Sequence, residues 1–151
     1  MKTYSTYYYK CKLVRENGVK FETIHDSQDV VSLVQKLDLM DASEEYMYLI
    51  CLDIKGQAIG YHEISHGDLS ATSASPREIF KRAVLNNAAG VILVHNHPSG
   101  CPVASEDDII ATKRNMEAGR VLGIKLVDHI IVAGGEHFKY VSLKADGLIP
   151  D

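Results

Sequence analysis

Residues 90–108 read GVILVHNHPSGCPVASEDD and combine signals for a strand, a loop and a helix start. The stretch opens with a wholly apolar run, GVILV (90–94), which is typical of a strand buried on both faces at the centre of a sheet. Two histidines and a Pro-Ser-Gly loop follow. Ser105 is a favourable N-cap, and the acidic residues directly after it suit the positive end of a helix. The stretch therefore predicts a central strand that leads through a loop into a helix.

Hydrophobic patterns on either side of this stretch predict a mixed α/β domain. Apolar runs predict strands at 45–53, 58–64, 126–132 and 138–143, and a hairpin over 4–24 that turns at Asn17-Gly18. Apolar residues at helical spacing predict helices that begin at Asp26 or Ser27, at Ser75-Pro76 and at Ser105. We expect about three helices flanking a five- or six-stranded mixed sheet, largely connected by hairpins. The expected organisation is one domain over 29–151, preceded by an N-terminal hairpin extension over 1–28.

Composition excludes several classes of function. The chain has 151 residues, of which 16 are basic and 20 acidic, so there is no strong nucleic-acid signature. No apolar run approaches the roughly 20 residues that cross a bilayer, and the N-terminus has no apolar signal-peptide core. Three scattered cysteines argue against a disulfide framework. We expect a cytoplasmic protein with no membrane partner.

Three side chains in residues 90–108 form a candidate metal site. His95 and His97 lie two apart at a strand end and can face the same side, while Asp108 lies in the first turn of the next helix. Three N/O ligands with an open fourth position are typical of catalytic zinc. Taken singly, the features are weak, since a His-x-His pair is often incidental and Ser105 and Asp108 suit any helix start. Their conjunction favours a zinc site.

The same spacing resembles a known motif. His95-x-His97-Pro98 followed by Ser105-x-x-Asp108 resembles the JAMM motif of the JAB/MPN metalloprotease superfamily. More narrowly, PREIF (76–80), HNHPSG (95–100) and DHII (128–131) resemble the RadC family, and the likeness covers about residues 29–147. The resemblance implies a deaminase-like α/β domain in which His95, His97 and Asp108 hold Zn²⁺.

The resemblance also implies two catalytic roles. The family's mechanism needs an upstream glutamate as general base, and Glu63 in YHEIS (61–65) is the best match. The alternative is that Glu63 is an exposed strand residue. Glu78 is a competitor, but its neighbour Arg77 favours a salt bridge there. Ser105 would help to hold the water or the developing oxyanion, in addition to capping the helix.

Two neighbouring features carry expectations of their own. Cys101 stands where RadC relatives commonly have Asp, and its thiol could approach the metal or face solvent. Pro98 and Pro102 restrict the loop, so we expect the thiol to face outward and leave the metal site open. Asp128 and His129 suit the support of a metal ligand, but a purely structural hydrogen-bonded pair is the favoured interpretation.

The sequence therefore predicts a zinc-dependent hydrolase, a metallopeptidase or isopeptidase acting on a peptide or protein substrate of unknown identity. A homo-oligomer is a further possibility that the sequence leaves open. The alternatives are a zinc-binding interaction module without catalysis, and a factor associated with DNA repair or mobile elements. The last rests on the family label alone.

Overall fold

The computed structural model describes residues 24–37, 39, 42–67, 74–134 and 138–150, together with isolated positions before residue 24. The hairpin expected over 4–24 lies almost wholly outside these described residues. The other expected strands and helices fall inside them. None of the described helices combines the length and apolar character that a membrane span needs.

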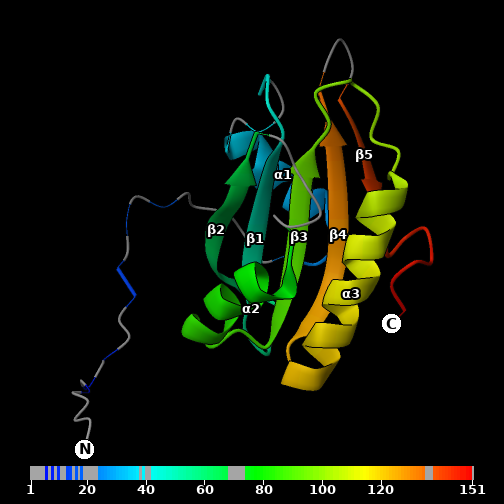
Figure 1. The fold of residues 1–151 in the computed structure, drawn as a ribbon. Helices are drawn as coiled ribbons and strands as arrows, with labels where there is room; N and C mark the ends of the chain where they lie inside the picture. The colour runs from blue at the N-terminus through cyan, green and yellow to red at the C-terminus, as the bar shows by residue number, and fades with distance from the viewer. Residues whose placement is uncertain are drawn as a thin grey trace, which may run out of the picture.

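The described residues form a mixed sheet of five strands in the order β2-β1-β3-β4-β5 (Figure 1). In chain order these are β1 (Tyr46–Leu52), β2 (Ala58–His66), β3 (Gly90–Asn96), β4 (Lys125–Ala133) and β5 (Lys139–Ser142). β3 and β4 are parallel, and the other neighbouring pairs are antiparallel. Every residue of β3 is buried, which confirms the predicted central strand. Hairpins join only β1 to β2 and β4 to β5, fewer than expected, because the other two connections are crossovers through helices.

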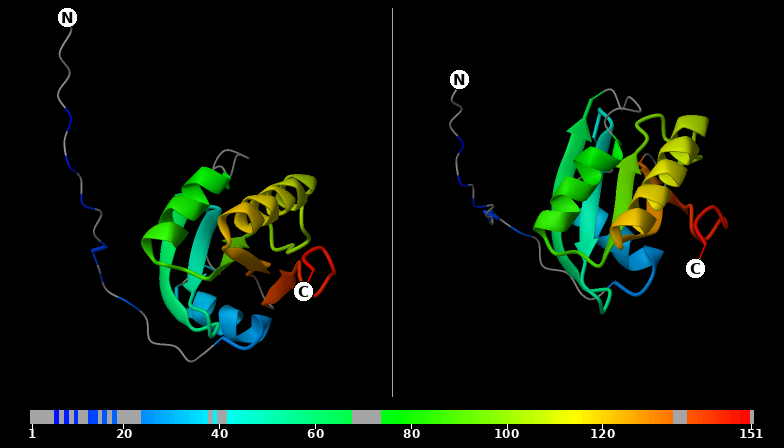
Figure 2. Two further views of the ribbon diagram at one scale, coloured as in Figure 1. Left: turned by 90° about the horizontal axis from the view of Figure 1, so that it is seen from below. Right: turned by 60° about the horizontal axis from the view of Figure 1, so that its bottom comes forward.

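In the described part of the chain, three helices cover the two faces of this sheet. They are α1 (Ser27–Lys36), α2 (Pro76–Leu85) and α3 (Glu106–Leu122), and each begins where the sequence predicts. Figure 2 shows α1 on one face and both α2 and α3 on the other. We call these the α1 face and the α3 face. The α/β class and the mixed, helix-flanked sheet expected from the sequence are confirmed.

Each face of the sheet has its own hydrophobic core. The α3 face buries Leu49 and Leu93 with the aromatic ring of Phe80, whereas the α1 face buries Ile50 and Ile92. This division follows from strand geometry, because successive side chains point to opposite faces. The alternation also fixes which polar side chains can meet at the strand ends.

Candidate metal centre

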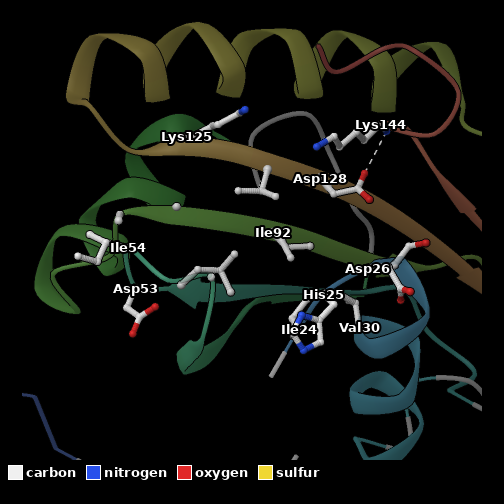
Figure 3. Close-up of a pocket in the computed structure, with 16 residues that line it drawn as sticks. Ile24, His25, Asp26, Val30, Asp53, Ile54, Ile92, Lys125, Asp128 and Lys144 are labelled. Carbon is white, nitrogen blue, oxygen red and sulfur yellow. Dashed lines mark hydrogen bonds between the residues drawn. The ribbon is translucent and has the colours of Figure 1, made fainter. Parts of the chain in front are cut away.

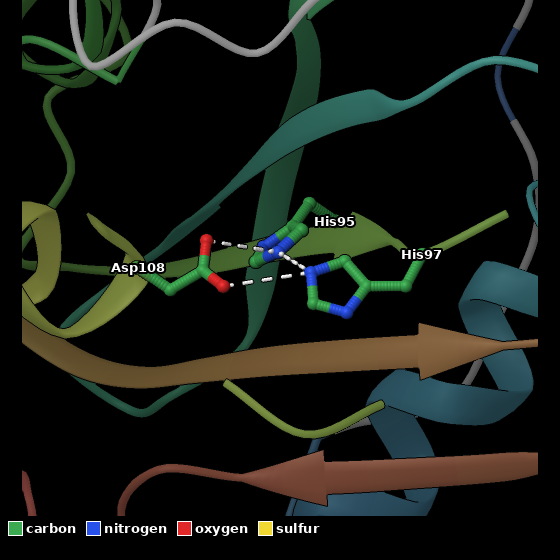
Figure 4. A group of neighbouring side chains, drawn as sticks. All are labelled: His95, His97 and Asp108. Carbon is green, nitrogen blue, oxygen red and sulfur yellow. Dashed lines mark hydrogen bonds and ion pairs between the residues drawn. The ribbon is translucent and has the colours of Figure 1, made fainter. Parts of the chain in front are cut away.

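His95 and His97 meet at the end of β3. His95 belongs to the strand and is fully buried, and His97 follows directly after it, with its backbone N–H bonded to the carbonyl of Val132 on β4 at 2.8 Å. This bond continues the ladder past the strand end and keeps both imidazoles on one face. The two Nε2 atoms lie 2.9 Å apart (Figure 4).

Asp108 reaches the histidines from the first turn of α3, which starts at the same end of the sheet as the end of β3 (Figure 1). Its Oδ1 lies 3.2 Å from Nε2 of His95, and its Oδ2 lies 3.5 Å from Nε2 of His97. A capping box holds the carboxylate: Ser105 donates its backbone N–H to Oδ2 at 2.7 Å and its hydroxyl at 2.6 Å. The helix cap thus positions the third candidate ligand.

The donor set of this cluster fits a metal ion. Nδ1 of His97 lies 2.8 Å from the carbonyl oxygen of Cys101. A carbonyl can only accept, so the proton of the neutral His97 ring is on Nδ1 and its Nε2 presents a lone pair; the second proton of the charged ring would face Asp108. Candidate ligand atoms of His95, His97 and Asp108 all lie within 4.8 Å of one another. Tetrahedral zinc with bonds of about 2.0–2.2 Å places its ligand atoms roughly 3.3–3.6 Å apart, so only small shifts would seat such an ion.

Charge at the cluster is consistent with cation binding. Burial opposes ionisation of Asp108, but hydrogen bonds from His95 and His97 outweigh it and hold the pKa of this carboxyl well below its usual range. The hydrogen bond to Asp108 raises the pKa of His97, against the effect of burial. The side chains of His97 and Asp108 are 14% and 16% exposed, so the cluster reaches solvent on one side.

Glu63, the general base expected from the sequence, is not brought to this cluster. Its Cα is paired with that of Tyr48, which packs on the α1 face, whereas His95 is paired with Met47 on the α3 face. The Glu63 carboxylate accepts a hydrogen bond from the Tyr48 hydroxyl at 3.4 Å and lies 2.8 Å from Nδ1 of His66. Its catalytic role therefore stays a prediction.

A different glutamate adjoins the cluster. Glu45 lies just before β1, two residues from Met47, whose Cα is paired with that of His95 on β3. The Asn96 side chain ties this segment to the end of β3: its Oδ1 accepts from the backbone N–H of Tyr46 at 2.6 Å, and its amide donates to the carbonyl of Glu44 at 2.9 Å. The negative charge of Glu45 is also one of the factors that raise the pKa of His97. Sequence reasoning missed Glu45 because the signal is its place at the start of the strand beside β3, and strand order is not legible in the sequence.

The structure places the remaining candidates as follows. Ser105 is the N-cap of α3, and its hydroxyl proton is directed at Asp108. A role for Ser105 toward an oxyanion stays a prediction. The thiol of Cys101 is exposed, as expected, and its residue contributes only the carbonyl that contacts His97.

The structural pairing of Asp128 with His129 that the sequence favoured is confirmed only in part: the two are hydrogen-bonded, but the His129 ring contacts His95 and not Asp128. The two are consecutive residues of β4 and project to opposite faces, so the Asp128 carboxylate bonds to the backbone N–H of His129 at 2.7 Å, not to its ring. That carboxylate also accepts from the Ser142 hydroxyl at 2.6 Å and from the backbone N–H of Lys144 at 3.0 Å. Asp128 also lines a separate cavity on the α1 face, with a volume of about 340 Å³. Figure 3 shows its side chain among the lining residues.

A mixed helix-flanked sheet with His-x-His at a strand end and a carboxylate in the next helix defines a JAB-type domain, a class that includes metalloproteases. The sequence model described as "RadC-like JAB domain" matches residues 24–148, and the chain belongs to this family. The family supports a hydrolase or metal-binding role.

Several similar proteins carry the family name UPF0758, which states no activity. The chain is 45% identical over 122 residues to a UPF0758 protein of Desulforamulus reducens, which covers 81% of this chain and 52% of that protein. It is 44% identical over 129 residues to a UPF0758 protein of Syntrophomonas wolfei, with 83% and 54% covered. A UPF0758 protein of Methanosarcina barkeri is 40% identical over 122 residues, with 81% and 52% covered. The chain thus spans about half the length of the curated relatives it matches.

Proposed function

We propose that this protein is a zinc-dependent hydrolase that cleaves an amide bond in a peptide or isopeptide substrate. The observation that carries the proposal is the convergence of His95, His97 and Asp108 at a partly exposed strand end. Two imidazoles and one carboxylate with a side open to solvent match the ligand set of catalytic zinc, whereas structural zinc prefers four protein ligands rich in cysteine. A zinc ion held there would supply Lewis-acid activation of water near neutral pH.

Glu45 is the preferred general base of this proposal. Its place between Glu44 and Tyr46, both of which bond to Asn96 at the end of β3, and its electrostatic effect on His97 support a carboxylate beside the reacting centre. From there Glu45 would take a proton from the attacking water and return it to the leaving amine. Glu63 is the competing candidate from the sequence. Its carboxylate contacts Tyr48 and His66, and its strand partner Tyr48 packs on the α1 face, opposite to the face of His95.

The test combines metal content with hydrolysis. Purified wild-type protein and the Asp108→Ala variant would be loaded with zinc, analysed for bound metal, and incubated with a library of fluorogenic peptides and with isopeptide-linked peptides. The proposal expects about one zinc per chain and product formation in the wild type only. Zinc binding without any hydrolysis above the Asp108→Ala background would favour the non-catalytic interaction module instead.

A further inference from the structure

His129 connects the metal site to helix α3. Its imidazole comes from β4, the neighbour of β3, and is 1% exposed. Nε2 of His129 lies 2.8 Å from Nδ1 of His95, and Nδ1 of His129 lies 2.6 Å from the hydroxyl of Thr112 on α3. That hydroxyl also donates to the backbone carbonyl of Asp108 at 2.6 Å. A single chain of hydrogen bonds therefore runs from one candidate ligand to the backbone of another.

The direction of every bond in this chain follows from its last member. The Asp108 carbonyl can only accept, so Thr112 uses its one hydroxyl proton there. Toward His129 the hydroxyl oxygen must then accept, which places the ring proton of neutral His129 on Nδ1. Nε2 of His129 is left as an acceptor, and the bond to His95 requires a proton on Nδ1 of that ring.

We propose that Thr112 and His129 are positioning residues that hold the ring proton of His95 on Nδ1 and thereby reserve its Nε2 for the metal ion. Two groups act in the opposite sense, because each would accept from a proton on Nε2 of His95: Oδ1 of Asp108 at 3.2 Å and Nε2 of neutral His97 at 2.9 Å. Groups that hold a ligand imidazole in one tautomer raise its ability to bind metal. The inference rests on the proposed function, since it concerns the same metal site.

One substitution separates this role from plain core packing. Thr112→Val keeps the shape of the side chain but removes the acceptor for Nδ1–H of His129, which would be left buried and unpaired. If that proton moves to Nε2 of His129, this nitrogen can donate to Nδ1 of His95. Nδ1 of His95 can accept only if the proton of His95 moves from Nδ1 to Nε2. Thr112→Ser keeps the hydroxyl and serves as the conservative rescue. Ser142→Ala deletes a different buried hydroxyl, bonded to Asp128 on the other face of β4, and is the matched structural control.

The first measurement is made without metal. Nitrogen-15 NMR of the histidine rings in zinc-free protein reports which nitrogen of each ring carries the proton. The inference expects a proton on Nδ1 of His129 in the wild type, in Thr112→Ser and in Ser142→Ala, and a switch to Nε2 of both His129 and His95 in Thr112→Val. Unchanged tautomers in a folded Thr112→Val protein would overturn it, whether or not the wild type binds zinc.

The second measurement is zinc affinity by competition with a chelator. Thr112→Val should bind zinc roughly 10–100-fold more weakly than the wild type, as for other changes to groups that orient metal ligands. Thr112→Ser and Ser142→Ala should stay near the wild-type affinity. An equal loss in Ser142→Ala would assign the effect to general loosening and overturn the inference. A wild type that binds no zinc but shows the tautomer switch would contradict the proposed function and leave the proton-holding role supported.

Discussion

The hydroxyl of Ser105 lies 2.6 Å from Oδ2 of Asp108, so the residue that caps α3 also fixes the carboxylate that completes the candidate metal site. Two requirements, starting a helix and orienting a ligand, are met by one Ser-x-x-Asp spacing. Stability and metal affinity should therefore respond together to changes at this cap.

Replacing Ser105 with Ala tests that coupling. Loss of an N-cap side chain typically costs about 1 kcal/mol of unfolding free energy, and Asp108 would also lose the hydroxyl that holds Oδ2. We expect urea denaturation of the zinc-free variant to show the lower stability and chelator competition to show weaker zinc binding. Ser105→Thr should retain most of both properties. A destabilised Ser105→Ala protein with wild-type zinc affinity would separate the two roles.

Removal of both histidine ligands should abolish metal binding without unfolding the domain. The two cores lie on either side of the sheet, and neither contains a metal ligand among its cluster residues. We expect a His95→Ala/His97→Ala protein to keep its far-ultraviolet circular dichroism spectrum and to contain no stoichiometric zinc. Full zinc content in this folded double variant, measured by elemental analysis, would contradict the site assignment.

The zinc-free cluster should make stability depend on pH in a defined window. The pKa of His97 is raised in the folded protein, mainly by its bond to Asp108, so its contribution is present below the unfolded value near 6.5 and is lost as pH rises through the folded pKa. The pKa of Asp108 is lowered, so its contribution is present above the unfolded value and is lost in acid. Urea denaturation should therefore show the largest difference between zinc-free wild type and His97→Ala near pH 5, and a smaller one at pH 8. A stability difference that grows toward pH 8 would contradict a raised pKa of His97 in the folded protein.

The sequence predicted the strand and helix starts well because their signals are local. Caps such as Asp26 and Ser105 and the apolar run 90–94 each act within a few residues, and the structure confirms all three elements. The candidate metal site could also be predicted from the sequence, because one strand, one loop and one helix start supply its three residues within a short stretch. Strand order was not legible, because it depends on long-range pairing. For that reason the side-chain contact of His129 with His95 and the nearness of Glu45 to His97 emerge only from the folded chain.

Cys101 should affect zinc binding little, because its thiol is exposed and only its carbonyl contacts the cluster through His97. Cys101→Ser retains that carbonyl, so we expect zinc affinity and stoichiometry close to wild type. Cobalt-substituted wild-type protein should likewise lack the intense thiolate-to-metal absorption of a cysteine ligand. Such a band in reduced wild type that disappears in Cys101→Ser would place sulfur on the metal.

The choice between Glu45 and Glu63 as general base can be decided by a matched pair of substitutions. Glu45→Gln and Glu63→Gln each remove one carboxylate charge with almost no change in size, and neither residue is among the metal ligands of the cluster. Loss of a general base typically lowers the rate of hydrolysis by roughly 10²–10⁴-fold. We expect that loss in Glu45→Gln with zinc retained. In Glu63→Gln we expect a rate near wild type. The Glu63 carboxylate contacts Tyr48 and His66, and its strand partner Tyr48 packs on the α1 face, away from the candidate metal site. The reverse pattern, measured with the same zinc-loaded proteins and the same peptide, would return the role to Glu63 and require β2 to present that side chain differently when substrate binds.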